Sequence, residues 1–393
     1  MGNRGRGRRE LWTQGIGLLV AAVTLGVWIC SNGTAAAQPY AYVTEVTPFD
    51  AAIGVIDTAT ATLVTSIPVE DGFYPSGVAA LPDGSRVFIA GINGGVATIS
   101  TATNALVAPT ADGGDEFRSA GVRPDGCQLY LPGSSEVTVL DPATFQLLGS
   151  IDLSPFGIQS LNHIAFSPDG RHAYATGRDS NPNGLVTEID TATLTVVGDP
   201  ILPCYTPPGE ADEVCSQYAD HVSVTPNGAE IWVTDHQLRE IWIINAATRA
   251  VTAFRPSDFV NDFLAFSPDG AHAYLGEAGG YAPSLQVVDT ATRSVVNEVS
   301  PDSIQEQIKD IAITPDGARG FLVGPGSGSV YVYDTASNTI SPNAIAVGAL
   351  STYIAIAAPI HQVSCPEPAA AWTGLAALAA LAATSARRRG QKI

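Results

Sequence analysis

The sequence predicts an all-β protein, a seven-bladed β-propeller of four-stranded blades, and three observations support this. A Pro-Asp-Gly or Pro-Asn-Gly turn recurs at Pro82, Pro124, Pro168, Pro226, Pro268 and Pro315. A phrase close to Ile-Asp-Thr-Ala-Thr recurs seven times, beginning at Ile56, Ile99, Leu140, Ile189, Ile244, Val288 and Tyr333. The repeat length of about 40 to 45 residues is typical of a four-stranded propeller blade.

Each repeat is predicted to contain four short strands. In the unit that begins at Leu161, "HIAFS", "HAYATG", "LVTEID" and "LTVVGD" are the expected strands, in that order. The Pro-Asp-Gly turn lies between the first two strands, where Pro presets φ and Gly supplies a positive φ. The Asp of "DTAT" can cap the backbone of its own turn. Since one blade cannot bury its faces alone, the fold needs the same unit many times.

The two ends of the repeat region complement each other. The first unit, from Ala41, lacks a first strand and its turn, whereas "TYIAIAAP" from Thr352 is a first strand with no unit after it. It resembles "KDIAITP" at Lys309. We therefore expect the strand over 352–358 to complete the first blade, which would close the ring and leave no exposed sheet edge.

Composition restricts the classes of partner. The 393 residues include 19 basic and 38 acidic side chains, and 45% are hydrophobic. A hydrophobic fraction of this size permits a substantial core, and an acidic surface repels phosphate backbones, which excludes nucleic acid as a partner. We expect a monomer that contacts a membrane only through its terminal segments.

Residues 1–37 are predicted to be a secretory signal peptide. Arginines precede an apolar run over Gly15–Cys30, and Ala35–Ala37 supplies small residues for cleavage before Gln38. The alternative is an uncleaved membrane anchor, and the sequence does not decide between Sec and twin-arginine export. The propeller is expected to occupy residues 38–362.

Residues 363–393 are predicted to be a sorting or transmembrane tail. Pro366, Glu367 and Pro368 precede an alanine-rich apolar stretch and the basic run Arg387–Arg389. Such a stretch can just cross a bilayer, with the arginines on the cytoplasmic side. The tail resembles the PEP-CTERM sorting signal, and this resemblance implies an exosortase-type sorting enzyme and display at the cell surface. Whether the tail is cleaved or retained stays open.

The repeats themselves resemble those of the YVTN family of β-propellers. "FSPDGRHAYATG" from Phe166, "FSPDGAHAYLGE" from Phe266 and "YVTE" from Tyr42 carry the resemblance, which extends over residues 40–359. It implies a propeller in an exported or surface-layer protein, most of which have no assigned activity. A more distant similarity is to lactonase propellers, although Asn162 stands where their Arg precedes the His, here His163.

The expected function is therefore an exported, surface-associated scaffold that binds a protein, a glycan or a small ligand without catalysis. No nucleophile elbow, phosphate loop, Cys-x-x-Cys or dinucleotide fingerprint is present in the sequence. The alternative is a lactonase-type hydrolase, or a metal-dependent lyase, with its site at the mouth of the central channel.

Alignment of the first strands gives one channel residue per blade. These residues are Gly77, Ser119, His163, His221, Phe263, Asp310 and Tyr353. Of these we expect Ser119, His163, His221, Asp310 and Tyr353 to bind ligand. The two histidines and Asp310 could form a transition-metal site or a general base with an electrostatic partner, and are the candidate catalytic residues. Alternatively, each forms hydrogen bonds only with a neighbour or with channel water.

A second candidate metal site is the segment that begins at Asp179. Asp179, Asn181 and Asn183, followed by Gly184, match the start of a calcium-binding loop. An ordinary Asn-Pro-Gly turn explains the same residues. Calcium and a transition metal are the only cofactors that the sequence brings into consideration.

The cysteines indicate export. Cys204 and Cys215 bracket an insertion in the fourth unit, Leu202–Tyr218, and are predicted to form a disulfide. Cys127 follows a turn and is a candidate free thiol, and the sequence does not decide the state of Cys127 or Cys365.

Overall fold

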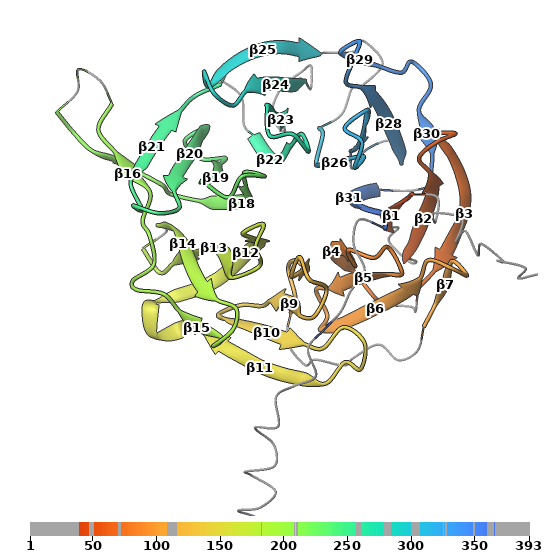
Figure 1. Cartoon of the computed structure of the whole chain (residues 1–393), viewed down its shortest axis with the longest axis horizontal. Helices are drawn as coiled ribbons and strands as arrows, with labels where there is room; N and C mark the ends of the chain where they lie inside the picture. The colour runs from red at the N-terminus through yellow and green to blue at the C-terminus, as the bar shows by residue number, and fades with distance from the viewer. Residues whose placement is uncertain are drawn as a thin grey trace, which may run out of the picture. The chain divides into compact units, whose positions relative to one another are not determined.

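The structure is a computed structural model that describes residues 39–46, 51–69, 72–107, 116–181, 183–207, 209, 211–256, 261–277, 284–299, 307–324, 326, 328–348, 350–359 and 365. Seven antiparallel sheets form a ring, and each contains a path of four strands from the centre outward (Figure 1). The predicted seven-bladed propeller is confirmed. The predicted signal peptide and the Pro-Glu-Pro motif with its apolar stretch lie outside the described residues. No helix within the described ranges is long and apolar enough to span a membrane.

The strand bounds follow the repeats. Blade 1 contains β1 (Tyr40–Val46), β2 (Ala51–Asp57), β3 (Thr62–Pro68) and β31 (Leu350–Ala357). Blade 2 contains β4 (Pro75–Ala80), β5 (Arg86–Gly91), β6 (Gly95–Ser100) and β7 (Ala105–Leu106). Blade 3 contains β8 (Gly121–Val122), β9 (Leu129–Pro132), β10 (Glu136–Leu140) and β11 (Leu147–Asp152), and the 3₁₀ turn η1 (Ser154–Phe156) follows it. Blade 4 contains β12 (Ile158–Phe166), β13 (His172–Asp179), β14 (Gly184–Asp190) and β15 (Thr195–Val196).

The remaining blades repeat this order. Blade 5 contains β18 (Ala219–Val224), β19 (Glu230–Asp235), β20 (Glu240–Asn245) and β21 (Val251–Phe254). Blade 6 contains β22 (Asn261–Phe266), β23 (His272–Glu277), β24 (Leu285–Asp289) and β25 (Ser294–Val299). Blade 7 contains β26 (Asp310–Ile313), β27 (Arg319–Val323), β28 (Ser329–Asp334) and β29 (Thr339–Ile340), with β30 (Ile345–Ala346) also paired to β28. A separate hairpin, β16 (Cys204–Tyr205) and β17 (Val214–Cys215), lies between blades 4 and 5 in the chain.

The last strand closes the ring, as the sequence predicts. β31 pairs antiparallel with β1, from Tyr40 opposite Ala357 to Val46 opposite Leu350, and the two strands lie side by side in Figure 1. β31 is also bonded to blade 7. The backbone N–H of Ile354, on β31, donates to Asp310 Oδ2 of blade 7 at 3.0 Å. The innermost strand of blade 1 is therefore held by both of its neighbours.

The hydrophobic core is divided into layers between blades. Among the described residues, each of seven clusters of buried side chains combines residues from two adjacent blades. For example, Trp232 of blade 5 packs with Leu264 of blade 6, and Phe88 of blade 2 packs with Leu129 of blade 3. Each blade thus buries its two faces only against its neighbours, which is the physical reason for the repetition.

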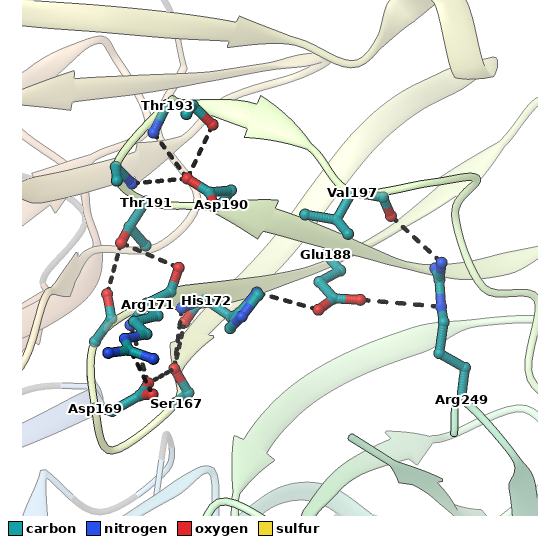
Figure 2. Close-up of polar contacts among 12 residues, drawn as sticks. Ser167, Asp169, Arg171, His172, Glu188, Asp190, Thr191, Thr193, Val197 and Arg249 are labelled. Atoms are coloured by element: carbon teal, nitrogen blue, oxygen red, sulfur yellow. Dashed lines mark hydrogen bonds and ion pairs between the residues drawn. The ribbon is translucent and has the colours of Figure 1, made fainter. Parts of the chain in front are cut away.

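The Pro-Asp-Gly turn is held by the residue before it. In blade 4, Ser167 Oγ donates to Asp169 Oδ1 at 2.7 Å and accepts from the N–H of His172 at 3.0 Å (Figure 2). Ser267, Thr225 and Thr314 make the corresponding bonds in blades 6, 5 and 7. The hydroxyl residue before the Pro therefore belongs to these four repeats for a local reason, because it fixes the hairpin between the first two strands, whereas Leu81 and Arg123 precede Pro82 and Pro124.

The two repeated phrases also meet in space. Thr191 Oγ1 of the "DTAT" turn donates to the carbonyl of Gly170 in the Pro-Asp-Gly turn at 2.6 Å, and Asp190 Oδ1 accepts the N–H of Thr193 at 2.8 Å (Figure 2). The bond between threonine and glycine recurs at Thr101, Thr290 and Thr335. These four repeats therefore fasten the hairpin of their first two strands to the hairpin of their last two.

Neighbouring turns also contact each other around the ring. Gly270 has a φ of 72°, and a Cβ at this position would lie 3.3 Å from the Pro226 ring of the preceding blade. The same contact joins Gly228 to Pro168, Gly317 to Pro268 and Gly170 to Pro124. At Gly84 the neighbour is Pro359, which follows the closing strand. Pro359 thus takes the place of the turn proline that the first unit lacks.

The residue after each "DTAT" phrase has a positive φ and contacts the preceding blade in several cases. These residues are Ala61, Asn104, Phe145, Leu194, Arg249, Arg293 and Asn338. Arg249 of blade 5 lies 3.9 Å from Glu188 of blade 4 and donates to the carbonyl of Val197, and Glu188 also lies 3.1 Å from His172 Nδ1 (Figure 2). His172 therefore takes part in a structural network between blades.

Two disulfides are present in the described part of the chain. Cys204 and Cys215 lie opposite each other in the β16–β17 hairpin and are bonded, as predicted. Cys127 is bonded to Cys365, so the expectation of a free thiol at Cys127 is wrong. The sequence missed this pair because its members are 238 residues apart, and only the folded ring brings Cys365 next to Cys127 of blade 3. Disulfides of this kind indicate an oxidising compartment.

Candidate functional site

The central cavity lies where the innermost strands begin. It has a volume of about 610 Å³, and all seven aligned channel residues line it. His236 and Ile92, which follow the second strands of blades 5 and 2, also line it, so the cavity opens at the end of the ring opposite the Pro-Asp-Gly turns.

β-Bulges precede the channel residues in four blades. The register of the inner strand shifts between Pro75 and Gly77, between Leu161 and His163, between Ala219 and Val222, and between Asn261 and Phe263. A bulge turns the following side chain out of the regular alternation. In these four blades the irregularity lies beside the residue that faces the cavity, so an alignment of the repeats finds the same position in each of them.

Three of the seven positions close the wall and present little surface. Phe263 is 1% exposed and Ser119 is 4% exposed. A Cβ on Gly77 would lie 2.7 Å from the Ser119 Cα, so blades 2 and 3 approach each other closely here. The predicted ligand contact through Ser119 would thus involve a nearly buried residue.

His163 and His221 form a stacked pair. Their ring centroids lie 3.8 Å apart, with an angle of 28° between the planes. Desolvation lowers the pKa of His163 to about 4. Desolvation and the nearby His163 hold the pKa of His221 well below its ordinary value. Both imidazoles are therefore neutral at pH 7, and neither buried Nδ1 atom has a hydrogen-bond partner among the described residues.

Asp310 does not join the histidines. Its Oδ1 accepts the N–H of Ile311 at 2.8 Å and its Oδ2 accepts the N–H of Ile354, so the carboxyl group links blade 7 to the closing strand. Burial raises the pKa of Asp310 to about 7, and the two backbone donors oppose this rise. The sequence placed Asp310 at the cavity, where it lies, but its hydrogen bonds stabilise the seam of the ring.

The described residues contain one group of three potential metal ligands whose ligand atoms all lie within 4.8 Å of one another. It consists of Cys204, Glu213 and Cys215, and two of these three are joined in a disulfide. His163, His221 and Asp310 do not form such a group. The geometry therefore brings together two of the three residues proposed for metal binding or catalysis, and leaves the third engaged elsewhere.

The same cavity contains a polar pair that the alignment of inner strands does not reveal. His236 Nδ1 lies 2.5 Å from Asp220 Oδ2, and the N–H of His236 donates to the same oxygen at 3.2 Å. Because the carboxylate accepts from Nδ1, the neutral ring has its acceptor at Nε2, which lies 3.2 Å from Gln237 Nε2. This is the arrangement in which a carboxylate fixes the orientation and tautomer of a histidine.

Asp235 positions this pair. It is 1% exposed, and its Oδ2 accepts from Ser216 Oγ at 2.7 Å and from the N–H of Tyr218 at 3.2 Å. Its Oδ1 accepts the N–H groups of Gln237 and Leu238, each at 3.0 Å. One buried carboxylate thus anchors the two segments that carry Tyr218 and His236. The sequence does carry a signal for Asp235, because it departs from the glycine that four other blades have at the same position. These glycines are Gly91, Gly133, Gly177 and Gly324, in blades 2, 3, 4 and 7.

The proposed calcium loop is a capped turn in the structure. Asp179 Oδ1 accepts the N–H groups of Asn181 and Asn183, at 2.7 and 3.0 Å, and its Oδ2 accepts from Asn183 Nδ2 at 2.9 Å. Both carboxylate oxygens are thus occupied by donors of the turn itself. This geometry is that of the Asn-Pro-Gly turn that the sequence offered as the alternative.

Comparisons with known proteins identify the fold. No family model matches the chain, and no curated protein matches it. Among solved structures, hydrazine synthase from Kuenenia stuttgartiensis matches with a TM-score of 0.59 and 19% identity, over 72% of this chain and 90% of that one. A likeness at this identity shows a shared fold alone. The similarities to YVTN repeats and to the PEP-CTERM signal therefore remain predictions from the sequence motifs.

Proposed function

We propose that the protein is an exported, surface-associated propeller that binds a small ligand or a glycan in its central cavity and does not transform it. The observation that carries the proposal is the cavity itself. At about 610 Å³ it falls within the range of small-molecule sites, and it combines half-buried aromatic rings with a few fixed polar groups. Export is supported by the two disulfides and by the signal-like N-terminus.

The ring architecture suits such a role. Seven blades converge on one site, and each contributes its aligned inner-strand residue, with further lining residues from several of the blades. The His163–His221 stack and the Asp220–His236 pair, which Asp235 anchors, place polar groups of fixed orientation in this site.

A thermal-shift screen of the purified protein tests this proposal. The library should contain small polar metabolites, oligosaccharides and divalent metals, each with the unmodified protein and with the double variant His163→Ala, His221→Ala. We expect at least one compound to raise the Tm of the unmodified protein and to lose this effect in the double variant. If no compound raises the Tm, or if the effect persists in the variant, the cavity is not the binding site.

A hydrolase of lactonase type is the second candidate function, and the Asp220–His236 pair favours it. A carboxylate-oriented histidine at a cavity can act as a general base toward water. A panel of lactones tests this alternative. Hydrolysis by the unmodified protein that disappears in His236→Gln, and persists in the control His272→Gln at the opposite end of the ring, would establish the enzyme and overturn the non-catalytic proposal.

A further inference from the structure

The wall that blades 4 and 5 contribute to the cavity is held together by hydrogen bonds within the protein. Asp235 holds the segment before β18 and the turn after β19 through backbone N–H groups. Tyr218 contacts the His236 ring at a centroid distance of 4.3 Å, and the Arg178 guanidinium carbon lies 5.1 Å from the Tyr218 centroid. The ring face and polar edge of Tyr218 are therefore held in a defined position at the cavity.

The polar groups of this wall are suited to uncharged partners that both donate and accept. The neutral imidazoles of His163 and His221 each carry one donor and one acceptor, and Asp220 adds a carboxyl group that also bonds to His236. Asn162 Nδ2 already donates to the carbonyl of Ala219 at 2.8 Å, which fixes the orientation of its amide. A ligand hydroxyl is likewise one donor and an acceptor, so it can satisfy either kind of group.

Charged ligands fit this cavity less well. The formal net charge of −19 and the carboxyl group of Asp220 in the lining oppose binding of an anion. Arg118 and Lys309 in the same lining oppose binding of a cation. The cavity size and the half-buried rings of Tyr218 and Tyr353 favour a ligand with a flat apolar face. Such a face can pack on these rings while the polar edge of the ligand bonds to the wall.

We propose that the central cavity binds a neutral saccharide, with its hydroxyls bonded to His163, His221 and the Asp220–His236 pair and a ring face packed on Tyr218. This inference rests on the proposed function and specifies its ligand class. A saccharide combines many hydroxyls with a flat apolar ring face, and no charge is required of either partner.

Isothermal titration at pH 7.5 tests the ligand class. The probes are neutral di- and trisaccharides of glucose, galactose, mannose and N-acetylglucosamine, with oligogalacturonate as an anionic comparator and spermidine as a cationic one. We expect a neutral saccharide to bind and its affinity to fall at least tenfold in Asp220→Asn and in His236→Gln. His272→Gln is the matched histidine control and should leave the affinity unchanged. Melting curves establish that each variant is folded.

The outcomes separate the ligand class from the site. Binding of only the charged probes, still weakened by the two cavity variants, overturns the saccharide proposal and leaves the cavity as a binding site. Saccharide binding that is indifferent to Asp220→Asn and His236→Gln also overturns it, because the wall would then not be the contact. If neither these probes nor the wider library bind, the proposed function fails as well.

Discussion

A buried carboxyl group at the ring seam should make the stability of the protein depend on pH. Glu45, on β1, is 6% exposed, and its Oε2 accepts from Ser66 Oγ at 3.2 Å. Its Oε1 is buried without a hydrogen-bond partner among the residues that the structure describes. Gly54 and Gly348 pack against the carboxyl so closely that a Cβ on either would lie 2.4 or 2.6 Å from a carboxylate oxygen. The group thus has little room and little solvation.

The direction and size of the effect follow from this environment. Desolvation raises the pKa of Glu45 from 4.5 to about 7, and the Ser66 hydrogen bond opposes this only partly. The folded state therefore holds the proton more tightly than the unfolded state does. Stability is at its full value below pH 4.5, falls as the pH rises, and is lowest above pH 7. A rise of this size corresponds to an upper limit of about 3 kcal/mol.

Urea unfolding of Glu45→Gln and of the unmodified protein between pH 4.5 and 8 measures this effect. Gln keeps the shape without ionising, so we expect similar unfolding free energies near pH 4.5 and a variant more stable by about 2–3 kcal/mol at pH 8. Other titrating groups affect both proteins equally and cancel in the difference. The exposed Glu116→Gln is the control and should show no such trend. A difference between Glu45→Gln and the unmodified protein that does not change with pH would refute the reasoning.

Three further predictions concern the histidine stack, the second disulfide and the turns. Since desolvation lowers the pKa of His163 to about 4, stability should decrease as the pH falls from 6.5 toward 4, by an upper limit of about 3 kcal/mol. His163→Phe should reduce this loss of unfolding free energy at acid pH, measured by urea unfolding. If the unfolding free energy of the variant falls with pH as steeply as that of the unmodified protein, His163 is not the cause. The double variant Cys127→Ser, Cys365→Ser removes a cross-link between residues 238 positions apart and should lower the unfolding free energy by up to about 5 kcal/mol. An unchanged urea midpoint would rule out a stabilising bond. Gly270→Ala places a Cβ at a position with a positive φ and against the Pro226 ring, so it should lower the unfolding free energy by about 1–2 kcal/mol. The control Gly72→Ala has a positive φ but no atom within 4 Å, so it should lower the unfolding free energy by less. Equal losses in the two variants would disprove the role of the contact between turns.

Much of the fold could be predicted from the sequence because its determinants are local and repeated. The Pro-Asp-Gly and "DTAT" phrases mark hairpins whose bonds lie within one unit, as those of Ser167 and Thr191 show. The closing strand was predictable because the first unit visibly lacks one. The bond between Cys127 and Cys365 was not predictable, because it joins residues 238 positions apart that only the folded ring brings together.

The candidate site was predictable only in part. Alignment of the inner strands gave the residues that face the cavity, because a common bulge aims the same position in several blades. It did not give their partners. Asp310 bonds to the closing strand, and His236 reaches the cavity from a turn after the second strand, outside the aligned position. Both facts depend on contacts between elements that no repeat pattern encodes.

The central claim is that ligand binds in the cavity at the start of the inner strands, and hydrogen–deuterium exchange with and without a bound probe tests it most directly. Ligand should slow exchange at Asn162 and His163 in β12, over Tyr218–His221 around the start of β18 and at His236, and should leave the Pro-Asp-Gly and Pro-Asn-Gly turns unchanged. Protection confined to the outer strands, or to the turns at the other end of the ring, would contradict it.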